Sequence, residues 1–302
     1  MSIGVVLLET ILRWFDSGIG SKTDDESPDW GRLVPFIALH LACFAVYFVG
    51  VSWIALVIAA VSYLIRIFAI TGFFHRYFSH KAFRVGRATQ FVFAAIGASA
   101  TQRGPLWWAA HHRAHHREPD TDVDPHNALR GFWWSHIGWF MSSTHFRTRT
   151  DLVNDWLKFP ELVWLDRFDL TVPVALVVFM YLLGESLAVM GTDGWQIVVW
   201  GYVISTVVLT HSTLCVNSIC HRYGRRRFET RDMSRNNWIV ALLTLGEGWH
   251  NNHHRYAGSA RQGFYWWELD LTYYGLVALS AIGLVKDLKG VPQTVLEEVV
   301  ER

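Results

Sequence analysis

Long apolar stretches alternate with polar segments along the 302-residue chain, and four of the apolar stretches are long enough to cross a bilayer. A helix needs about 20 residues to cross the hydrocarbon layer. Only short turns separate the two members of each pair, so each pair is predicted to form a helical hairpin whose ends return to one side. The predicted spans are residues 33–50, 51–70, 171–191 and 195–216.

Positive charge is distributed unevenly around these spans. Residues 171–217 contain no Lys or Arg, and Arg66 is the only such residue in 33–70. Because Lys and Arg stay on the cytoplasmic side of a membrane, residues 72–170 and 217–302 are predicted to form one cytosolic cap. The pattern therefore predicts an all-α membrane protein, with two helical hairpins that carry a helical cap, and one domain over the full chain.

Composition agrees with a membrane protein and argues against some partners. Hydrophobic residues make up 51% of the chain, and the 16 tryptophans are of the type that collects at membrane interfaces. The formal net charge of +1 gives no indication of a nucleic-acid partner. Residues 1–15 are too short and too charged for a cleavable signal peptide, and are expected to form an amphipathic helix on the membrane surface.

Nine histidines form three clusters and one isolated position near the ends of the predicted spans. Two clusters share the pattern HxxHH, and positions i, i+3 and i+4 lie on one face of a helix. Zinc is usually satisfied by four ligands, so nine imidazoles are enough for two metal ions. Imidazole binds several transition metals and does not identify the metal. The nine are His75, His80, His112, His115, His116, His221, His250, His253 and His254.

The second cluster leaves one choice open, because His111 is also four residues from His115. The repeated HxxHH pattern favours His112 as the ligand. Acidic residues commonly orient metal-bound histidines, and a solvated or capping role is an equally good interpretation of each candidate; these candidates are Asp124, Glu247 and Asp270. The other histidines are expected to be structural, and they are His40, His126, His136, His145 and His211.

Six segments share their order, spacing and flanking residues with a known family. They are HRYFSH (75–80), HHRAHH (111–116), DPHN (124–127), SHIGW (135–139), NSICH (217–221) and GEGWHNNHH (246–254). Together they resemble the integral-membrane fatty acyl desaturases, in particular the Δ9, stearoyl-CoA-desaturase-like branch. The resemblance implies a non-haem di-iron centre held by the nine histidines, with Asn217 reaching one iron through a water.

The resemblance also implies an activity. It implies an enzyme that uses O₂ to introduce a cis double bond, at Δ9, into a saturated acyl chain carried as acyl-CoA. Acyl-lipid or acyl-ACP carriers remain alternatives, as do hydroxylation and oxidative decarboxylation at the same centre, and a membrane metal-binding protein is the non-enzyme alternative. Electrons are expected from a separate ferredoxin or cytochrome b5-like protein with its reductase. The GPLWWAAHH segment is typical of bacterial relatives, which implies the inner membrane with the active site on its cytoplasmic side.

Contacts with the acyl carrier are expected to differ from those of the animal acyl-CoA desaturases, because the chain departs from them at two pairs of residues. It has Ala110-His111 and Ser143-Thr144 where those enzymes have the charged pairs that help hold CoA. The arginines that could compensate are Arg103, Arg130, Arg147 and Arg149. The resemblance also places the methyl end of the acyl chain at Tyr63 and Ala59 on one face of the second span, where Tyr63 closes the tunnel. The alternative is that Tyr63 faces lipid or another span.

Overall fold

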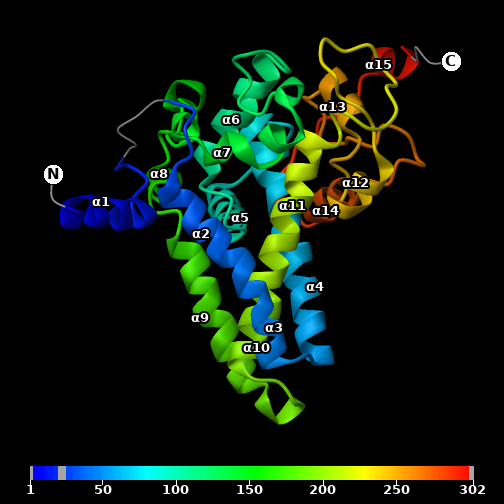
Figure 1. The fold of residues 1–302 in the computed structure, drawn as a ribbon. Coiled ribbons are helices and arrows are strands. Elements are labelled where there is room, and N and C mark those ends of the chain that lie inside the picture. Colours follow the sequence, from blue (N-terminus) through cyan, green and yellow to red (C-terminus); the bar gives the residue numbers. More distant parts are fainter. Residues whose placement is uncertain (1–2, 20–24, 299–302) are drawn as a thin grey trace.

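A computed structural model describes residues 3–19 and 25–298, and helices dominate this part of the chain. Long helices form a bundle that descends from a larger head (Figure 1). The bundle helices are α2 (Trp30–Leu41), α3 (Val46–Val49), α4 (Trp53–Phe68), α9 (Thr171–Ser186), α10 (Gly194–Val198) and α11 (Ser205–Ser218). Helix α1 (Ile3–Phe15) projects sideways where bundle and head meet. Its exposed apolar residues include Leu8, Leu12 and Phe15.

The head is built from short helices and loops packed on the upper ends of α4 and α11 (Figure 1). Its helices, together with α5 beneath it, are α5 (Arg87–Ala98), α6 (Pro105–Arg117), α7 (Trp139–Met141), α8 (Pro160–Arg167), α12 (Trp238–Leu243), α13 (His250–Arg255), α14 (Leu271–Ala281) and α15 (Gln293–Glu297). Two short strands, β1 (Arg84–Val85) and β2 (Val285–Lys286), pair in antiparallel register.

Segments of 3-10 and π-helix extend or connect these helices. They are η1 (Ala42–Ala45), η2 (Ala69–Ser79), η3 (Ala128–Arg130), η4 (Trp134–Gly138), η5 (Ser143–His145), η6 (Thr150–Leu152), η7 (Ala188–Met190) and η8 (Val199–Ile204). Because η1, η2 and η8 run directly into their neighbours, α2–α3, α4–η2 and α10–α11 each form one long helix.

Three helices in the described part of the chain are long and apolar enough to cross a membrane: Trp30–Val49, Trp53–Ser79 and Gly194–Ser218. They cover the first and second predicted spans except for residues 50–52 of the turn, and the whole of the fourth. The third predicted span, 171–191, is only partly helical, because α9 ends at Ser186 and is too short alone. It becomes long enough when joined to α8 across a bend of 75°.

The two hairpin turns lie at the end of the bundle farthest from the head (Figure 1). Gly50 has a φ of 66°, a left-handed conformation that glycine adopts without strain, and Ser52 then caps α4. Gln196 ties the turns together, because it accepts a hydrogen bond of 2.6 Å from Ser52 and donates one of 2.8 Å to the Val49 carbonyl. These hydrogen bonds connect the start of α10, in the second hairpin, directly to the turn of the first hairpin.

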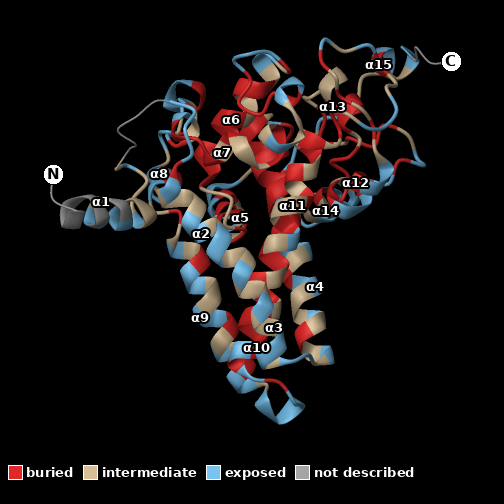
Figure 2. Ribbon diagram, in the orientation of Figure 1, coloured by how far each residue is buried: buried red, intermediate tan, exposed pale blue. Residues whose placement is uncertain are grey.

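Burial is concentrated in the head and in the upper half of the bundle (Figure 2). Aromatic side chains of η2 fill this core; Phe73, for example, stacks on Phe93 of α5 with ring centroids 3.9 Å apart. The lower bundle instead presents large apolar side chains outward, such as Phe48 and Val189. A wholly apolar outer surface is expected where a helix contacts lipid.

Candidate metal centre

The nine clustered histidines come together at the junction of head and bundle as two adjacent groups. Within each group the ligand atoms all lie within 4.8 Å of one another. The five-histidine group contains His75, His80, His112, His116 and His253. The four-histidine group contains His115, His221, His250 and His254. Metal binding by these groups remains a prediction. Whether they fit a metal ion depends on the orientation and the protonation of their imidazoles.

Each HxxHH motif serves both groups. On α6, His112 and His116, four residues apart, join the five-histidine group, whereas His115 points to the other. On α13, His253 joins the five-histidine group, whereas His250 and His254 join the four-histidine group. Successive residues on an α-helix point in different directions, so a helix lying between two sites supplies both.

The spacing of five residues between His75 and His80 is explained by η2. This segment is π-helical, and the His80 N–H donates to the His75 carbonyl. In a π-helix the hydrogen bond joins residues five apart, so the fifth residue lies one turn ahead on the same side. In an α-helix the two imidazoles would point apart. The wide turns therefore let both histidines enter the five-histidine group.

Carboxylates orient three imidazoles of the four-histidine group. Each imidazole uses Nδ1 for this contact and turns Nε2 toward the other histidines. The pairs are His115 with Asp124 at 2.8 Å, His221 with Asp120 at 2.9 Å, and His254 with Asp232 at 2.7 Å. Such contacts fix the tautomer and the ring orientation of metal-binding histidines.

The facing nitrogens of His115 and His254 indicate which kind of ligand the four-histidine group can bind. Both Nδ1 atoms donate to carboxylates, so in the neutral imidazoles both Nε2 atoms carry a lone pair. These two Nε2 atoms lie 3.2 Å apart. Two lone pairs at this distance repel each other unless a proton or a cation lies between them. The nitrogen donors therefore fit a metal ion that is shared by the group.

Burial keeps most of these imidazoles neutral. Burial, with the neighbouring imidazoles, holds the pKa of five of them far below the usual value, and lowers the pKa of His254 to about 4. The five are His80, His112, His116, His250 and His253. His115 differs, because the carboxylate of Asp124 outweighs burial and raises its pKa. Neutral nitrogens are the form that a metal ion requires.

The five-histidine group has a different charge environment. Its carboxylate, Glu247, accepts from Nδ1 of His75 and also forms an ion pair of 2.9 Å with Arg76. Arg76 is buried and pairs with Asp270 as well, at 3.0 Å. Of the two roles considered for these acids, Asp124 and Glu247 contact histidines. Asp270 instead caps α14 and reaches the site through Arg76. Three carboxylates serve the four-histidine group, and the one serving the five-histidine group is paired with an arginine.

Sequence reasoning missed two of these acids and did not foresee the contacts of several other histidines. Asp120 and Asp232 carry no motif that marks them. His126, expected to be structural, lies beside His115 with ring centroids 4.2 Å apart and shares Asp124 with it. His136 contacts His211 at 3.0 Å, and His211 contacts His40 at 2.9 Å, so these three histidines form a hydrogen-bonded chain that is compatible with a structural role.

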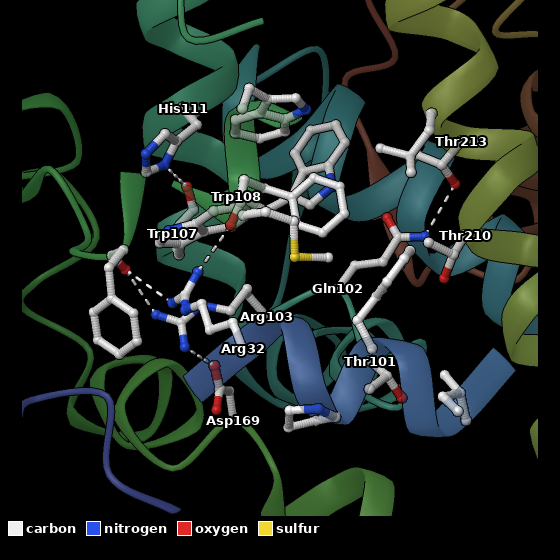
Figure 3. Close-up of a pocket in the computed structure, with 18 of the residues that line it drawn as sticks. Arg32, Thr101, Gln102, Arg103, Trp107, Trp108, His111, Asp169, Thr210 and Thr213 are labelled. Carbon is white, nitrogen blue, oxygen red and sulfur yellow. Dashed lines mark hydrogen bonds and ion pairs between the residues drawn. The ribbon is translucent and has the colours of Figure 1, made fainter. Parts of the chain in front are cut away.

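A cavity of about 360 Å³ lies beside the five-histidine group, bounded mainly by α2, α6, α7 and α11. His112 and Asn217 line it, and they also line a smaller void of about 30 Å³ that reaches His75 and His250. The side chain of Gln102 crosses to α11 and donates to Thr213 at 3.1 Å, as Figure 3 shows. The larger cavity has the size and the mainly apolar walls of a ligand site.

His111 also lines the cavity but joins neither group. Its Nδ1 contacts the Trp107 carbonyl at 3.0 Å, and its Nε2 has no partner among the described residues. Asn217, predicted to reach a metal through a water, lies on α11 one turn before His221 and faces both cavities. The structure thus places His112, and not His111, among the clustered imidazoles.

The predicted substrate residues are scattered. Arg103 lines the larger cavity. Arg130 pairs instead with exposed Glu26, and Arg147 is exposed. Neither cavity is lined by Tyr63 or Ala59, and the Tyr63 hydroxyl donates to the Leu243 carbonyl. The role of all five in substrate binding stays a prediction.

Comparison with known proteins places this site in a family. The fatty acid desaturase model matches residues 51–281. The chain is 38% identical over 269 residues to acyl-CoA 5-desaturase AL21 of Anemone leveillei, covering 87% of this chain and 80% of that protein. It is 39% identical over 272 residues to the sn-1 stearoyl-lipid 9-desaturase of Synechocystis sp., covering 89% and 83%.

A third relative differs in its carrier. The chloroplastic palmitoyl-monogalactosyldiacylglycerol delta-7 desaturase of Arabidopsis thaliana is 36% identical over 289 residues, covering 94% of this chain and 75% of that protein. The relatives thus agree on desaturation and differ in carrier and position. The extent of these matches, together with the histidine motifs, shows that the chain belongs to the fatty acid desaturase family.

Proposed function

We propose that the chain is an O₂-dependent desaturase that introduces a cis double bond at Δ9 of a saturated acyl chain, using two irons. The observation that carries the proposal is the position of His112, which belongs to the five-histidine group and lines the apolar cavity. An acyl chain in that cavity lies beside the proposed metal ligands. Relatives named as 9-desaturases support the position of the double bond.

The reaction sets what the protein must provide. Two hydrogens leave adjacent carbons, O₂ is reduced to two waters, and the balance requires two electrons and two protons from outside the substrate. The irons would supply the activation of O₂. The protein residues hold the imidazoles neutral, orient them through carboxylates and exclude water from the acyl chain. A separate ferredoxin or cytochrome b5-like protein with its reductase supplies the electrons.

We also propose how the chain is placed in the membrane. The bent α8–α9 pair is the third of four spans, the rest of the head is the cytosolic cap, and the chain acts as one domain in the inner membrane of a bacterium. The hairpin turns at the far end support this orientation, since residues 171–217 carry no Lys or Arg. An acyl-CoA carrier is the starting assumption.

Product analysis tests the function. The chain is expressed in a host that lacks desaturases, together with an electron donor, and its fatty acids are analysed by mass spectrometry after the double bonds are derivatised. We expect cis Δ9 products, and none with His112→Ala. Hydroxylated or shortened products would instead favour hydroxylation or decarboxylation, and metal-loaded protein with a competent donor that yields no altered acyl chain would refute an enzymatic role.

A further inference from the structure

Three arginines gather on one side of the larger cavity, around the ring of Phe146. The guanidinium carbons of Arg13, Arg32 and Arg103 lie 4.6, 3.7 and 4.9 Å from the ring centroid. They come from α1, the first turn of α2 and the loop before α6, so only the fold brings them together. All three line the cavity, and Figure 3 shows Arg32 and Arg103 side by side near Asp169.

Two members of this arginine cluster (Arg13, Arg32 and Arg103) are paired with carboxylates, and the third has no such partner among the described residues. Arg13 forms an ion pair of 2.5 Å with Asp29, and Arg103 forms one of 2.6 Å with Asp169. Arg32 has no ion pair within the described residues. Arg13 and Arg103 thus each have a carboxylate partner, whereas Arg32 stands at the cavity wall without one among the described residues.

The hydrogen bonds of Arg32 are also incomplete. Its guanidinium donates only to the carbonyls of Phe140 and Phe146, at 3.4 and 3.3 Å. These distances are beyond the usual range for N–H donors, and a guanidinium has five N–H groups. The unused donors line a cavity whose other walls are mainly apolar. A cation beside an apolar cavity attracts an anion more strongly than one in water.

We propose that the arginine cluster binds a phosphate of the acyl carrier, so that the substrate is an anionic, phosphate-bearing acyl ester. The inference rests on the proposed function and names its substrate class. Arginine is suited to phosphate because its planar fork can donate two hydrogen bonds to one phosphate. The phosphate could belong to a phospholipid or to CoA, and the two share this chemistry. A neutral galactolipid, like that in the name of the Arabidopsis relative, lacks the required charge.

Binding without turnover tests the inference. Metal-loaded, full-length protein in detergent is titrated, with no reductant present, with distearoyl-phosphatidylglycerol, stearoyl-CoA and distearoyl-monogalactosylglycerol. Arg32→Gln should weaken binding of at least one phosphate ligand by roughly 10-fold, the loss expected for a hydrogen bond to a charged group, and leave the galactolipid unchanged. Arg87→Gln is the matched control, because Arg87 pairs with Glu161 at the surface outside this cavity.

The ligand that responds identifies the carrier: phosphatidylglycerol indicates a phospholipid and stearoyl-CoA indicates the thioester. If Arg32→Gln weakens all three ligands equally, or none, the inference is wrong. Should that variant fail to fold, Arg32→Lys decides the matter. Lysine keeps the charge but cannot donate two hydrogen bonds from a planar fork, so this change should weaken binding of the phosphate ligands only. A folded Arg32→Lys variant that binds both phosphate ligands as tightly as the wild type would overturn the inference.

The binding assay is independent of the reaction. If phosphate ligands bind through Arg32 but no desaturated product forms with a competent electron donor, the proposed function fails and the arginine cluster stands. If product forms and Arg32 has no effect on binding of either phosphate ligand, the cluster fails and the proposed function stands.

Discussion

Asp232→Asn should remove metal from the four-histidine group alone. One Asp232 oxygen accepts from Nδ1 of His254 at 2.7 Å, and the other accepts from the Ser234 N–H at 2.8 Å. Asparagine has the same size but only one acceptor oxygen, so its amide group must face one of these two N–H donors. If it faces His254, the imidazole proton moves to Nε2, the nitrogen that points at His115.

The expected magnitude follows from the lost hydrogen bond. A hydrogen bond to a charged group contributes about 1.5–3 kcal/mol, which corresponds to roughly 10- to 100-fold weaker metal binding. The same range is typical of residues that orient metal ligands. Asp232 contacts no histidine of the five-histidine group among the described contacts, so metal affinity there should change by less than about twofold.

A chelator titration measures this difference. Iron content per chain is followed by mass spectrometry of the metal as chelator concentration rises, with Asp151→Asn, at an exposed acid, as the matched substitution. We expect the variant to hold one iron at chelator concentrations where the wild type and Asp151→Asn hold two. A folded Asp232→Asn variant that releases both irons together, or that matches the wild type, would refute the reasoning.

Three further predictions follow from the site. His112→Ala should abolish product formation while His111→Ala keeps measurable activity, and the reverse result would reassign the α6 ligand. Burial holds the pKa of four of the five imidazoles in the five-histidine group well below 6.5, so below about pH 6.5 the unfolded chain binds more protons than the folded one. Metal-free protein should therefore melt at a lower temperature at about pH 5 than at about pH 7.5, which scanning fluorimetry can check. Finally, Tyr63→Ala should shift product profiles by gas chromatography to longer chains and Ala59→Phe to shorter ones; unchanged profiles in folded, metal-loaded variants would place the tunnel end elsewhere.

The fold was predictable where hydrophobic length alone decides it. Apolar stretches located two hairpins, but their helical limits depend on local geometry that composition does not encode. The second span was predicted to end at residue 70, yet its helix continues through η2 to Ser79, because π-turns carry buried aromatic residues into the head. The third was predicted to reach residue 191, yet α9 stops at Ser186.

The candidate site was predictable to the level of residue type. Regular spacing identified the nine histidines, since the helical period repeats in the sequence. Their division into two groups depends on where α6 and α13 lie between the sites. The carboxylates depend on loop packing; Asp120, for example, meets His221 from 101 residues away. The arginine cluster could not be predicted from the sequence either, because Arg13 and Arg103 are far apart in the chain and only the fold brings them together.

The distribution of the histidines along the chain also has a consequence for biosynthesis. In chain order, the five-histidine group begins with His75, at the head end of the long helix Trp53–Ser79, and is completed only by His253 on α13. A ribosome that has delivered both hairpins to the membrane has therefore not yet delivered either full set of imidazoles. If the groups bind iron as proposed, stable loading of both ions must follow insertion and the synthesis of α13, and a chain truncated before α13 would enter the bilayer without the means to retain them.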